Sequence, residues 1–533
     1  MPGRSATTHT TVCHLLRARA EVHGDRPLFR FEGREVSYRQ VEQDSNRLAR
    51  VLADLGVRRG DRVAIMLPNG LDFPLAWFAV AKTGAIGVPV NIQLREADLG
   101  YILRHSGASH ALAGSAQVAM LASVHGSCPE LKVVSAFGDG AATPGCVNLE
   151  SRIRAAASEW NIDSLDAHDP VVVQYTSGTT GMPKGCLLHH RYWLRMAEGI
   201  QRHVALGPDD TVLTAQPFSY MDPIWNMIMC VLAGARLVIL PRFSASTFWR
   251  SVKENDVTFF YCIGTMPIYL HAQPPDPATE RGHRVRLVYC SAIPPALHAA
   301  FEQRWGCAWR EAYGSTELGA VLIVPPTDSA SVGSGSLGEP LPRYEVRVVG
   351  PDGRDVADGG PGELVVRGED TMLGYFRDAD ATAAWMEGGW AHTGDVAIRD
   401  TGGRFRLVGR LKDMIRRAGE NIAAAEVESV LMEHPDVLAA ACVPVPDAMR
   451  GEEVKAFVQL RPGRSPASVT PSDLLAFAGG RLADFKVPRF VEYVAEFPLT
   501  PSAKIAKAVL LAARPDQRSG AYDAVAGRWG DDA

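Results

Sequence analysis

The sequence predicts an α/β fold, in which a large N-terminal domain of stacked, mostly parallel sheets with helices and a small β-barrel precedes a smaller α+β C-terminal domain. Three observations predict it. The chain has 533 residues, which is too long for one hydrophobic core. Apolar strand runs alternate with helical patterns over roughly the first 400 residues. After that, the pattern of apolar and turn residues changes twice.

The alternation is clearest near the N-terminus. A buried-strand run at 61–67 is followed by helical apolar spacing at 73–83 and by another strand at 87–90. Apolar runs of the same kind recur at 171–175, 211–215, 236–240, 258–262 and 286–290. Strands that are separated by helices in this way predict parallel sheets covered on both faces.

The first change of this pattern lies near residue 345. Short strands at 345–349, 362–367 and 404–407 are separated by Gly, Pro and Asp turns. This pattern predicts a small antiparallel β-barrel or sheet that closes the large domain. A second boundary lies at 409–413. Beyond it, a helical pattern that ends at Pro435 indicates an α+β unit.

These boundaries divide the chain into three parts. We place the large domain at residues 1–411 and the small domain at 412–514. Residues 515–533 are rich in Gly, Asp and Arg, and we expect a flexible tail there.

The composition excludes several classes of protein. Hydrophobic residues make up 46% and charged residues 22%, and the net charge of −5 comes with dispersed Lys and Arg, so that no nucleic-acid footprint stands out. The longest apolar stretch, 225–240, contains Asn226 and Arg236, so no membrane span is expected. The nine cysteines form no CxxC pair, which favours reduced thiols and a cytoplasmic location.

The most informative segment is the string YTSGTTGMPKG at 175–185, directly after the apolar run 171–173. Its small residues let backbone N–H groups approach an anion, its hydroxyls add donors, and Lys184 adds a positive charge. No Lys-Ser or Lys-Thr pair follows the second glycine, so the string is not a Walker A loop. A flexible surface loop is the alternative, but the whole string favours a phosphate-binding loop.

This string resembles the signature of the adenylate-forming superfamily, which comprises acyl-CoA synthetases, peptide-synthetase adenylation domains and luciferases. The likeness continues in order from about Arg26 to about Lys507. In that family the loop is mobile and binds the β- and γ-phosphates of ATP. The resemblance implies phosphate contacts from Thr176, Ser177, Gly178, Thr179, Thr180 and Lys184.

The string EAYGSTE at 311–317 matches the next element of the family. The match implies that Tyr313 and Gly314 lie against adenine, that Thr316 offers a hydroxyl to phosphate, and that Glu317 is a hard oxygen ligand for Mg²⁺. Alone, such a string is a surface turn. Its position in the order of the family's motifs is what favours a nucleotide-binding site.

Three further segments complete the nucleotide site by resemblance. Ser291 and Ala292 match the small-residue segment that lies beside adenine. The carboxylate of Asp395, in the TGD string, can accept hydrogen bonds from both ribose hydroxyls. Arg410 then binds the ribose or the phosphates.

The resemblance also implies that the small domain is mobile and rotates about Lys412. A catalytic lysine near the C-terminus reaches the carboxylate and the α-phosphate. The string PLTPSAK at 498–504 makes Lys504 the better candidate, with Lys507 as the alternative. The string GENI at 419–422 resembles the acceptor tunnel, although Ala418 stands where many CoA ligases have glycine.

Residues 217–223 occupy the stretch that shapes the acyl pocket in the family, so we assign Tyr220, Asp222 and Trp225 to that pocket. The nearest resemblance is to crotonobetaine/carnitine-CoA ligases, whose substrates carry a cationic nitrogen, and a carboxylate beside an indole suits a cation or an amine. The alternative is that Asp222 only caps a helix that starts at Pro223.

The resemblance implies an ATP- and Mg²⁺-dependent ligase that adenylates a small carboxylic acid and transfers it to CoA. An alternative is adenylation followed by transfer to an amine, including a diazotase that activates nitrite for an aryl amine in natural-product biosynthesis. A non-catalytic nucleotide sensor is disfavoured, because Lys504, Glu317 and the loop threonines are all present. The sequence leaves open whether the protein is a monomer or a homodimer.

Overall fold

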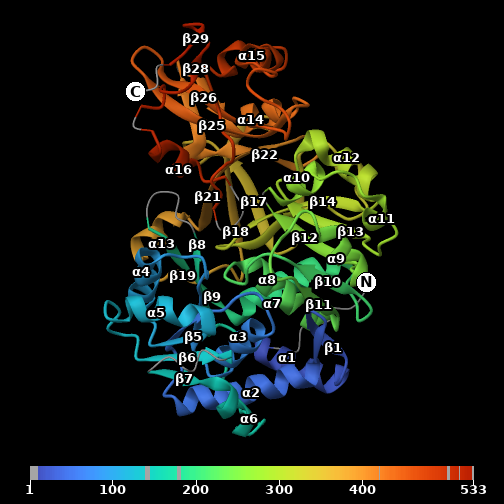
Figure 1. Cartoon of the computed structure of the whole chain (residues 1–533), viewed down its shortest axis with the longest axis vertical. Helices are drawn as coiled ribbons and strands as arrows, with labels where there is room; N and C mark the ends of the chain where they lie inside the picture. Colours follow the sequence, from blue (N-terminus) through green and yellow to red (C-terminus); the bar gives the residue numbers. More distant parts are fainter. Residues whose placement is uncertain are drawn as a thin grey trace.

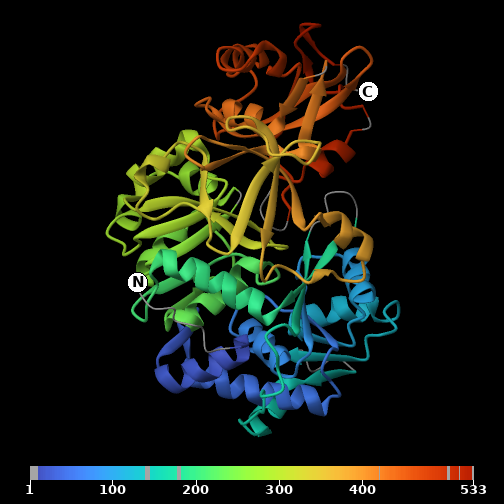
Figure 2. The same cartoon turned by 180° about the vertical axis from the view of Figure 1, so that it is seen from behind.

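The polypeptide forms a large lower unit and a smaller upper unit in Figures 1 and 2. The structure is a computed structural model, and it describes residues 10–138, 145–176, 182–263, 265–418, 420–500, 505–514 and 516–530. Within these residues the strands form three sheets. Two sheets belong to the large unit and the third to the small unit, in agreement with the predicted α/β fold.

The first sheet of the large unit has eight strands in the order β19-β9-β8-β4-β3-β5-β6-β7. The pairs from β8 through to β7 are parallel, whereas β9 and β19 add antiparallel pairs at one edge. The strands are β3 (Arg62–Met66), β4 (Ile86–Pro89), β5 (His110–Gly114), β6 (Val133–Phe137), β7 (Cys146–Asn148), β8 (Pro170–Thr176), β9 (Lys184–His189) and β19 (Gly374–Tyr375).

The second sheet has fourteen strands, in the order β17-β18-β21-β22-β16-β15-β14-β13-β12-β10-β11-β1-β2, with β20 beside β21. Its parallel part runs from β14 to β1. The strands of this part and the edge are β1 (Pro27–Phe31), β2 (Arg34–Ser37), β10 (Thr211–Thr214), β11 (Arg236–Ile239), β12 (Phe259–Ile263), β13 (Leu287–Ser291) and β14 (Ala308–Ser315).

The sequence predicts a small antiparallel β-barrel or sheet after β14, and the described residues form the sheet and no closed barrel. The antiparallel strands after β14 extend the second sheet as an open path, because β17 pairs with β18 and not with β16. The strands are β15 (Gly319–Ile323), β16 (Ser336–Pro340), β17 (Tyr344–Val349), β18 (Pro361–Gly368), β20 (Met386–Glu387), β21 (Trp390–Arg399) and β22 (Phe405–Arg410). Short strands with Gly turns are compatible with either arrangement, so the sequence could not decide between them.

Helices fill the space between the two sheets and cover their outer faces. The largest core contains buried residues of α1 (Val12–His23), α2 (Tyr38–Asp54), α3 (Asp72–Lys82), α7 (His190–Val204) and α8 (Met221–Ala233). Figure 1 shows α7 and α8 between the sheets. Residues of α4 (Glu96–Ser106) and α5 (Val118–His125) form one outer core, and residues of α9 (Phe248–Glu254), α10 (Met266–Ala272) and α12 (Pro295–Trp305) form another. Shorter helices are α6 (Leu149–Ala155), α11 (Pro277–Glu280) and α13 (Ala379–Trp385).

Local sequence explains where these elements begin. Helix α2 starts after a capping box, in which the Ser37 side chain accepts from the Gln40 N–H and the Gln40 side chain accepts from the Ser37 N–H. Strand β3 is buried from Val63 to Met66, as expected for a parallel strand that is covered on both faces.

The small unit is built on the third sheet, in the order β24-β23-β26-β27-β28-β29, with β25 paired to β26. Helices α14 (Ala424–Met432) and α15 (Pro471–Gly479) pack on it, and α16 (Lys507–Ala512) contributes to a second core. The strands are β23 (Met414–Arg417), β24 (Glu420–Ala423), β25 (Val437–Asp447), β26 (Gly451–Leu460), β27 (Phe490–Tyr493), β28 (Tyr522–Asp523) and β29 (Arg528–Trp529).

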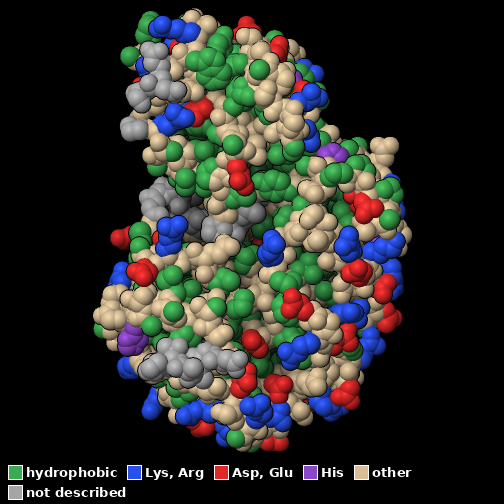
Figure 3. All heavy atoms as spheres, in the orientation of Figure 1, with side chains coloured by type: hydrophobic (Ala, Val, Ile, Leu, Met, Phe, Trp, Pro, Cys, Tyr) green, Lys and Arg blue, Asp and Glu red, His purple; other side chains and the backbone are tan. Residues whose placement is uncertain are grey.

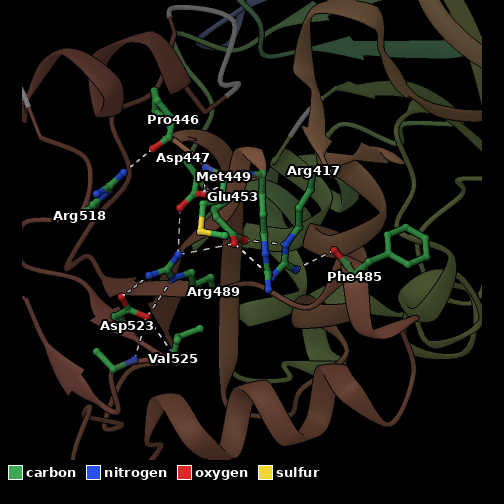
Figure 4. A network of polar contacts seen from close by, with 12 residues as sticks. Arg417, Pro446, Asp447, Met449, Glu453, Phe485, Arg489, Arg518, Asp523 and Val525 are labelled. Atoms are coloured by element: carbon green, nitrogen blue, oxygen red, sulfur yellow. Dashed lines mark hydrogen bonds and ion pairs between the residues drawn. The ribbon is translucent and has the colours of Figure 1, made fainter. Parts of the chain in front are cut away.

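The flexible tail that the sequence predicts is wrong for residues 516–530. Strand β28 pairs with β27, and Arg489 binds Asp523 with two hydrogen bonds of 3.1 and 3.0 Å (Figure 4). The Ala524 N–H donates to the Arg489 carbonyl oxygen at 2.8 Å. Two-residue strands in a Gly- and Asp-rich segment carry no periodic signal, so the composition concealed them.

The surface agrees with the dispersed charge of the sequence. Figure 3 shows Lys and Arg side chains intermixed with Asp and Glu over the face that it presents. In the part of the chain that the structure describes, no helix is long and apolar enough to cross a membrane.

Candidate active site

A cavity of about 470 Å³ opens where four parallel strands end. Its wall includes Thr176 at the end of β8, Ile263 at the end of β12, Ser291 at the end of β13 and Ser315 at the end of β14. The carboxyl ends of the strands are where open α/β sheets bind ligands. Helices α7 and α8 and the end of β22 complete the wall.

One side of the cavity is shaped by a turn that Glu311 holds in place. The Glu311 carboxylate accepts the Ala292 N–H at 2.6 Å and the Ile293 N–H at 2.8 Å. Ala292 has φ +69°, which is a strained conformation for a residue with a side chain. Burial raises the pKa of Glu311 to about 8, and the two N–H donors oppose that rise only in part. No role was predicted for Glu311, although it is the first residue of the EAYGSTE string.

Tyr313, Asp395 and Arg410 form a second wall. The Tyr313 hydroxyl donates to Oδ2 of Asp395 at 2.6 Å, and Nε of Arg410 lies 2.8 Å from Oδ1. Burial, and then the Asp395 charge, raises the pKa of Tyr313 well above its ordinary value, so the phenol stays a donor. Each Asp395 oxygen retains a further lone pair, so that this carboxylate can still accept a hydroxyl. Asp395 itself is buried behind Tyr313 and Arg410.

Gly314 and Thr316 follow Tyr313 along the wall. A Cβ on Gly314 would collide with the Gly319 carbonyl oxygen of the neighbouring strand β15, so this close approach requires glycine. The Thr316 hydroxyl lies 3.5 Å from the Met221 sulfur of α8, and the Tyr192 hydroxyl donates to the Thr316 carbonyl oxygen at 3.0 Å.

Glu317 is held by a tyrosine that the sequence did not single out. The Tyr375 hydroxyl donates to Oε1 of Glu317 at 2.9 Å, and Nζ of Lys184 lies 5.0 Å from the centre of the Tyr375 ring. No group of three potential metal-binding side chains occurs in the described ranges. Mg²⁺ commonly uses one or two carboxylates with phosphate oxygens and water, so Glu317 fits a Mg²⁺–nucleotide complex.

The predicted phosphate loop connects two paired strands. Thr176 of β8 pairs with Lys184 of β9, and both line the cavity. The Thr176 hydroxyl lies 3.5 Å from the Lys184 carbonyl oxygen. The other predicted phosphate contacts, Ser177, Gly178, Thr179 and Thr180, lie outside the described residues.

The predicted acyl-pocket residues lie together at the start of α8. The helix begins at Met221 with Tyr220 as its N-cap residue and no side-chain cap. Asp222 therefore lies within the first turn, and the prediction that it caps a helix starting at Pro223 is wrong. Nε1 of Trp225 lies 3.4 Å from Oδ1 of Asp222. All three predicted residues line the cavity.

Tyr261 and Asn91, for which the sequence predicted no role in the site, support this end of the cavity. The Trp225 ring meets the Tyr261 ring edge-on, with centroids 5.2 Å apart. The Tyr261 and Ser291 hydroxyls lie 2.7 Å apart, which connects the acyl side to the predicted adenine segment. Nδ2 of Asn91 donates to the Tyr220 hydroxyl at 3.3 Å.

The remaining predicted residues belong to the small unit or its connection. Lys412 lies in the short 3₁₀ turn Leu411–Asp413, directly after Arg410, and does not line the cavity. Lys504 lies outside the described residues. The alternative, Lys507, forms an ion pair with Glu428 of α14 at 2.6 Å.

Ala418 lies in the turn between β23 and β24. It is exposed and has φ +52°. This left-handed conformation favours glycine. The Ala418 N–H donates to the Arg450 carbonyl oxygen at 2.8 Å.

Comparison with known proteins gives a family match in each of the two units. The family model of AMP-binding enzymes matches residues 16–376, and that of the AMP-binding enzyme C-terminal domain matches residues 426–504. The sulfoacetate–CoA ligase of Cupriavidus necator is 33% identical over 506 residues, which cover 94% of this chain and 97% of that protein. The crotonobetaine/carnitine–CoA ligase of Salmonella paratyphi A is 31% identical over 502 residues, which cover 92% and 96%.

Solved structures agree with this result. The anthranilate CoA ligase AuaEII in complex with anthranoyl-AMP superposes with a TM-score of 0.88 at 26% identity, covering 94% of this chain and 97% of that one. The amide bond synthetase McbA from Marinactinospora thermotolerans gives a TM-score of 0.84 at 26% identity, covering 94% and 99%.

Proposed function

Since the chain belongs to the family of AMP-binding enzymes, we propose that it is an ATP-dependent ligase that activates a small carboxylic acid as an acyl-adenylate and transfers the acyl group to CoA. One observation carries the proposal. Candidate nucleotide residues, among them Tyr313, Thr316 and Arg410, line the same cavity as the candidate acyl-pocket residues. They meet where Thr316 contacts Met221 of α8, so a nucleotide and an acid can lie against each other there.

In the first half-reaction, the carboxylate of the acid attacks the α-phosphorus of ATP and pyrophosphate leaves. Tyr313 contacts adenine, Asp395 accepts the ribose hydroxyls, and Lys184 with the loop 176–184 binds the outer phosphates. Lys504 neutralises charge at the α-phosphate. Glu317 would hold Mg²⁺, which would supply further neutralisation of the phosphate charge. Phosphoryl transfer needs mainly such neutralisation and in-line positioning.

In the second half-reaction, the small domain rotates about Lys412 and the acceptor attacks the acyl-adenylate. CoA is the acceptor named for the sulfoacetate and crotonobetaine/carnitine relatives. All nine cysteines of the chain are free and eight are buried, which agrees with action in the cytoplasm, where ATP and CoA are available.

A second candidate function is transfer of the activated group to an amine. The structural likeness to an amide bond synthetase favours it, and so does Ala418, which places a methyl group in the proposed acceptor turn. Activation of nitrite for an aryl amine belongs to this candidate and differs from it only in the acid that is adenylated.

The test is a panel assay with Mg·ATP. Each carboxylic acid, and nitrite, is supplied with CoA, with an aryl amine, or with no acceptor, and pyrophosphate, AMP and products are identified by mass. We expect an adenylate with at least one acid and a thioester when CoA is present. Nitrite-dependent AMP release without a thioester from any acid would overturn the proposal. Ala418→Gly then reports on the tunnel, because it raises CoA turnover only where the methyl group obstructs CoA.

A further inference from the structure

Two contacts connect the ends of the predicted phosphate loop, residues 175–185, to helix α4. At one end, the Tyr175 hydroxyl lies 2.7 Å from Nδ1 of His105. At the other end, the Tyr101 hydroxyl donates to the Pro183 carbonyl oxygen at 3.1 Å. Both ends of the loop are therefore bound to the same helix.

The two side chains of α4 act as one support. Tyr101 and His105 are four residues apart and lie on one face of the helix, and their rings stack with centroids 5.4 Å apart. Burial, and then the Arg377 charge, lowers the pKa of His105, whereas burial raises the pKa of Tyr175. At neutral pH the imidazole is therefore uncharged, and its Nδ1 can accept the Tyr175 hydroxyl hydrogen.

The end of strand β19 fixes this support to the first sheet. The Phe376 N–H donates to the Gly185 carbonyl oxygen at 2.7 Å, and the Phe376 ring meets the His105 ring edge-on with centroids 6.2 Å apart. The Arg377 guanidinium donates to the His105 carbonyl oxygen at 3.0 Å. Figure 1 shows α4 beside β19. Helix α4 is thus held against the same sheet edge that the loop leaves and re-enters.

The residues that the helix holds precede two residues of the cavity wall. Thr176 directly follows Tyr175, Lys184 directly follows Pro183, and both line the cavity. A hydroxyl or a cation that is already held in place contributes more to binding, because less entropy is lost when the ligand arrives.

Building on the proposed ligase function, we propose that Tyr101 and His105 are positioning residues that hold Thr176 and Lys184 where the outer phosphates of ATP bind. Neither of them is among the described residues that line the cavity, so they act through the two ends of the loop. AMP lacks the outer phosphates. The support from α4 therefore strengthens the binding of ATP and leaves the binding of AMP unchanged.

The experiment measures nucleotide binding to the full-length protein without any acid. Calorimetry gives the Kd for AMP and for Mg²⁺-bound α,β-methylene-ATP, which has three phosphates and cannot be split at the α-phosphorus. Tyr101→Phe removes one hydroxyl and keeps the ring. We expect it to raise the Kd for the ATP analogue by about 3- to 10-fold, the usual effect of one hydrogen bond, and to leave the Kd for AMP unchanged.

A matched pair of variants tests His105. His105→Phe keeps a planar ring and removes the acceptor, whereas His105→Asn supplies a side-chain oxygen that can accept the Tyr175 hydroxyl. We expect His105→Phe to raise the Kd for the ATP analogue by about 3- to 10-fold and His105→Asn to restore most of the binding. Tyr522→Phe, in β28 of the small unit, is the control and should bind both nucleotides as the wild type does.

The outcomes separate this proposal from the function on which it rests. An unchanged Kd for the ATP analogue in Tyr101→Phe or in His105→Phe, an equal loss of AMP binding, or no recovery in His105→Asn overturns the positioning role and leaves the ligase function standing. If the wild type binds neither nucleotide, the ligase function falls, and the positioning role falls with it.

Discussion

At the scale of single residues, the buried carboxylate of Glu311 links the shape of the site to pH. Its pKa is raised by burial from the ordinary 4.5 to about 8. Between these values the folded protein retains a proton that the unfolded chain has released. The contribution to stability is therefore fully present below pH 4.5 and is lost as the pH rises toward 8.

The first prediction follows from this linkage. The free energy of unfolding of the wild type falls between pH 5 and 8 with a Glu311 contribution of at most about 1.4 kcal/mol per pH unit. Glu311→Gln removes that contribution and leaves one backbone N–H without an acceptor, at a cost of about 1–3 kcal/mol. Urea denaturation at several pH values measures both. Glu345→Gln, an exposed control, keeps the wild-type slope, and an unchanged slope in Glu311→Gln would contradict the assignment.

A second prediction at this scale concerns the two lysines near the C-terminus. Lys504→Ala should slow adenylation by about 100- to 1000-fold, the usual effect of removing one group aimed at developing charge, and largely spare transfer from a supplied acyl-adenylate. Lys507→Ala should lose the ion pair with Glu428 and cost stability with little effect on adenylation. Pyrophosphate release measures the first half-reaction. The reverse pattern would move the catalytic role to Lys507.

At the scale of elements, the sequence predicted those parts whose signal is periodic or dense. The buried strands of the parallel sheets and the strings around Tyr313 and Lys184 were recognisable because each carries many constrained residues. The Asp222–Pro223 pattern predicted the start of helix α8 two residues too late, because the helix begins at Met221 with no side-chain cap. Tyr375 lies in the two-residue strand β19 and reaches Glu317 only through tertiary packing. Such contacts leave no local pattern.

The short turn Leu411–Asp413 between the two units provides the prediction for this scale. Lys412→Pro fixes φ at the proposed pivot. We expect acyl-adenylate to form within about threefold of the wild-type rate, while thioester formation slows about tenfold or more because rotation is hindered. Single-turnover measurements separate the steps. Lys412→Ala is the control for loss of the side chain alone, and equal loss of both steps in Lys412→Pro would argue against a hinge here.

At the scale of the whole molecule, the C-terminal segment stabilises the small unit, for which we propose the rotation. Lys455 is fully buried, and its Nζ binds Glu492 and the Gln517 carbonyl oxygen, each at 2.6 Å. Arg489 connects Asp523 of β28 to Asp447 at the end of β25 (Figure 4). Residues 516–530 thus contact two strands of the small unit, β26 through Lys455 and β27 through its pairing with β28.

Removing residues 515–533 is the last prediction. Lys455 then loses one acceptor and Arg489 its bidentate partner, and losing a hydrogen bond to a buried charge costs about 1.5–3 kcal/mol. The cost falls on the small unit, because its cores are separate from those of the large unit. We therefore expect an earlier unfolding transition for the small unit, loss of adenylation with it, and retained stabilisation of the large unit by AMP. Calorimetry with and without AMP measures both transitions, and removal of 531–533 alone is the matched control. A single transition at the wild-type temperature would show that this segment contributes nothing to the stability of the small unit.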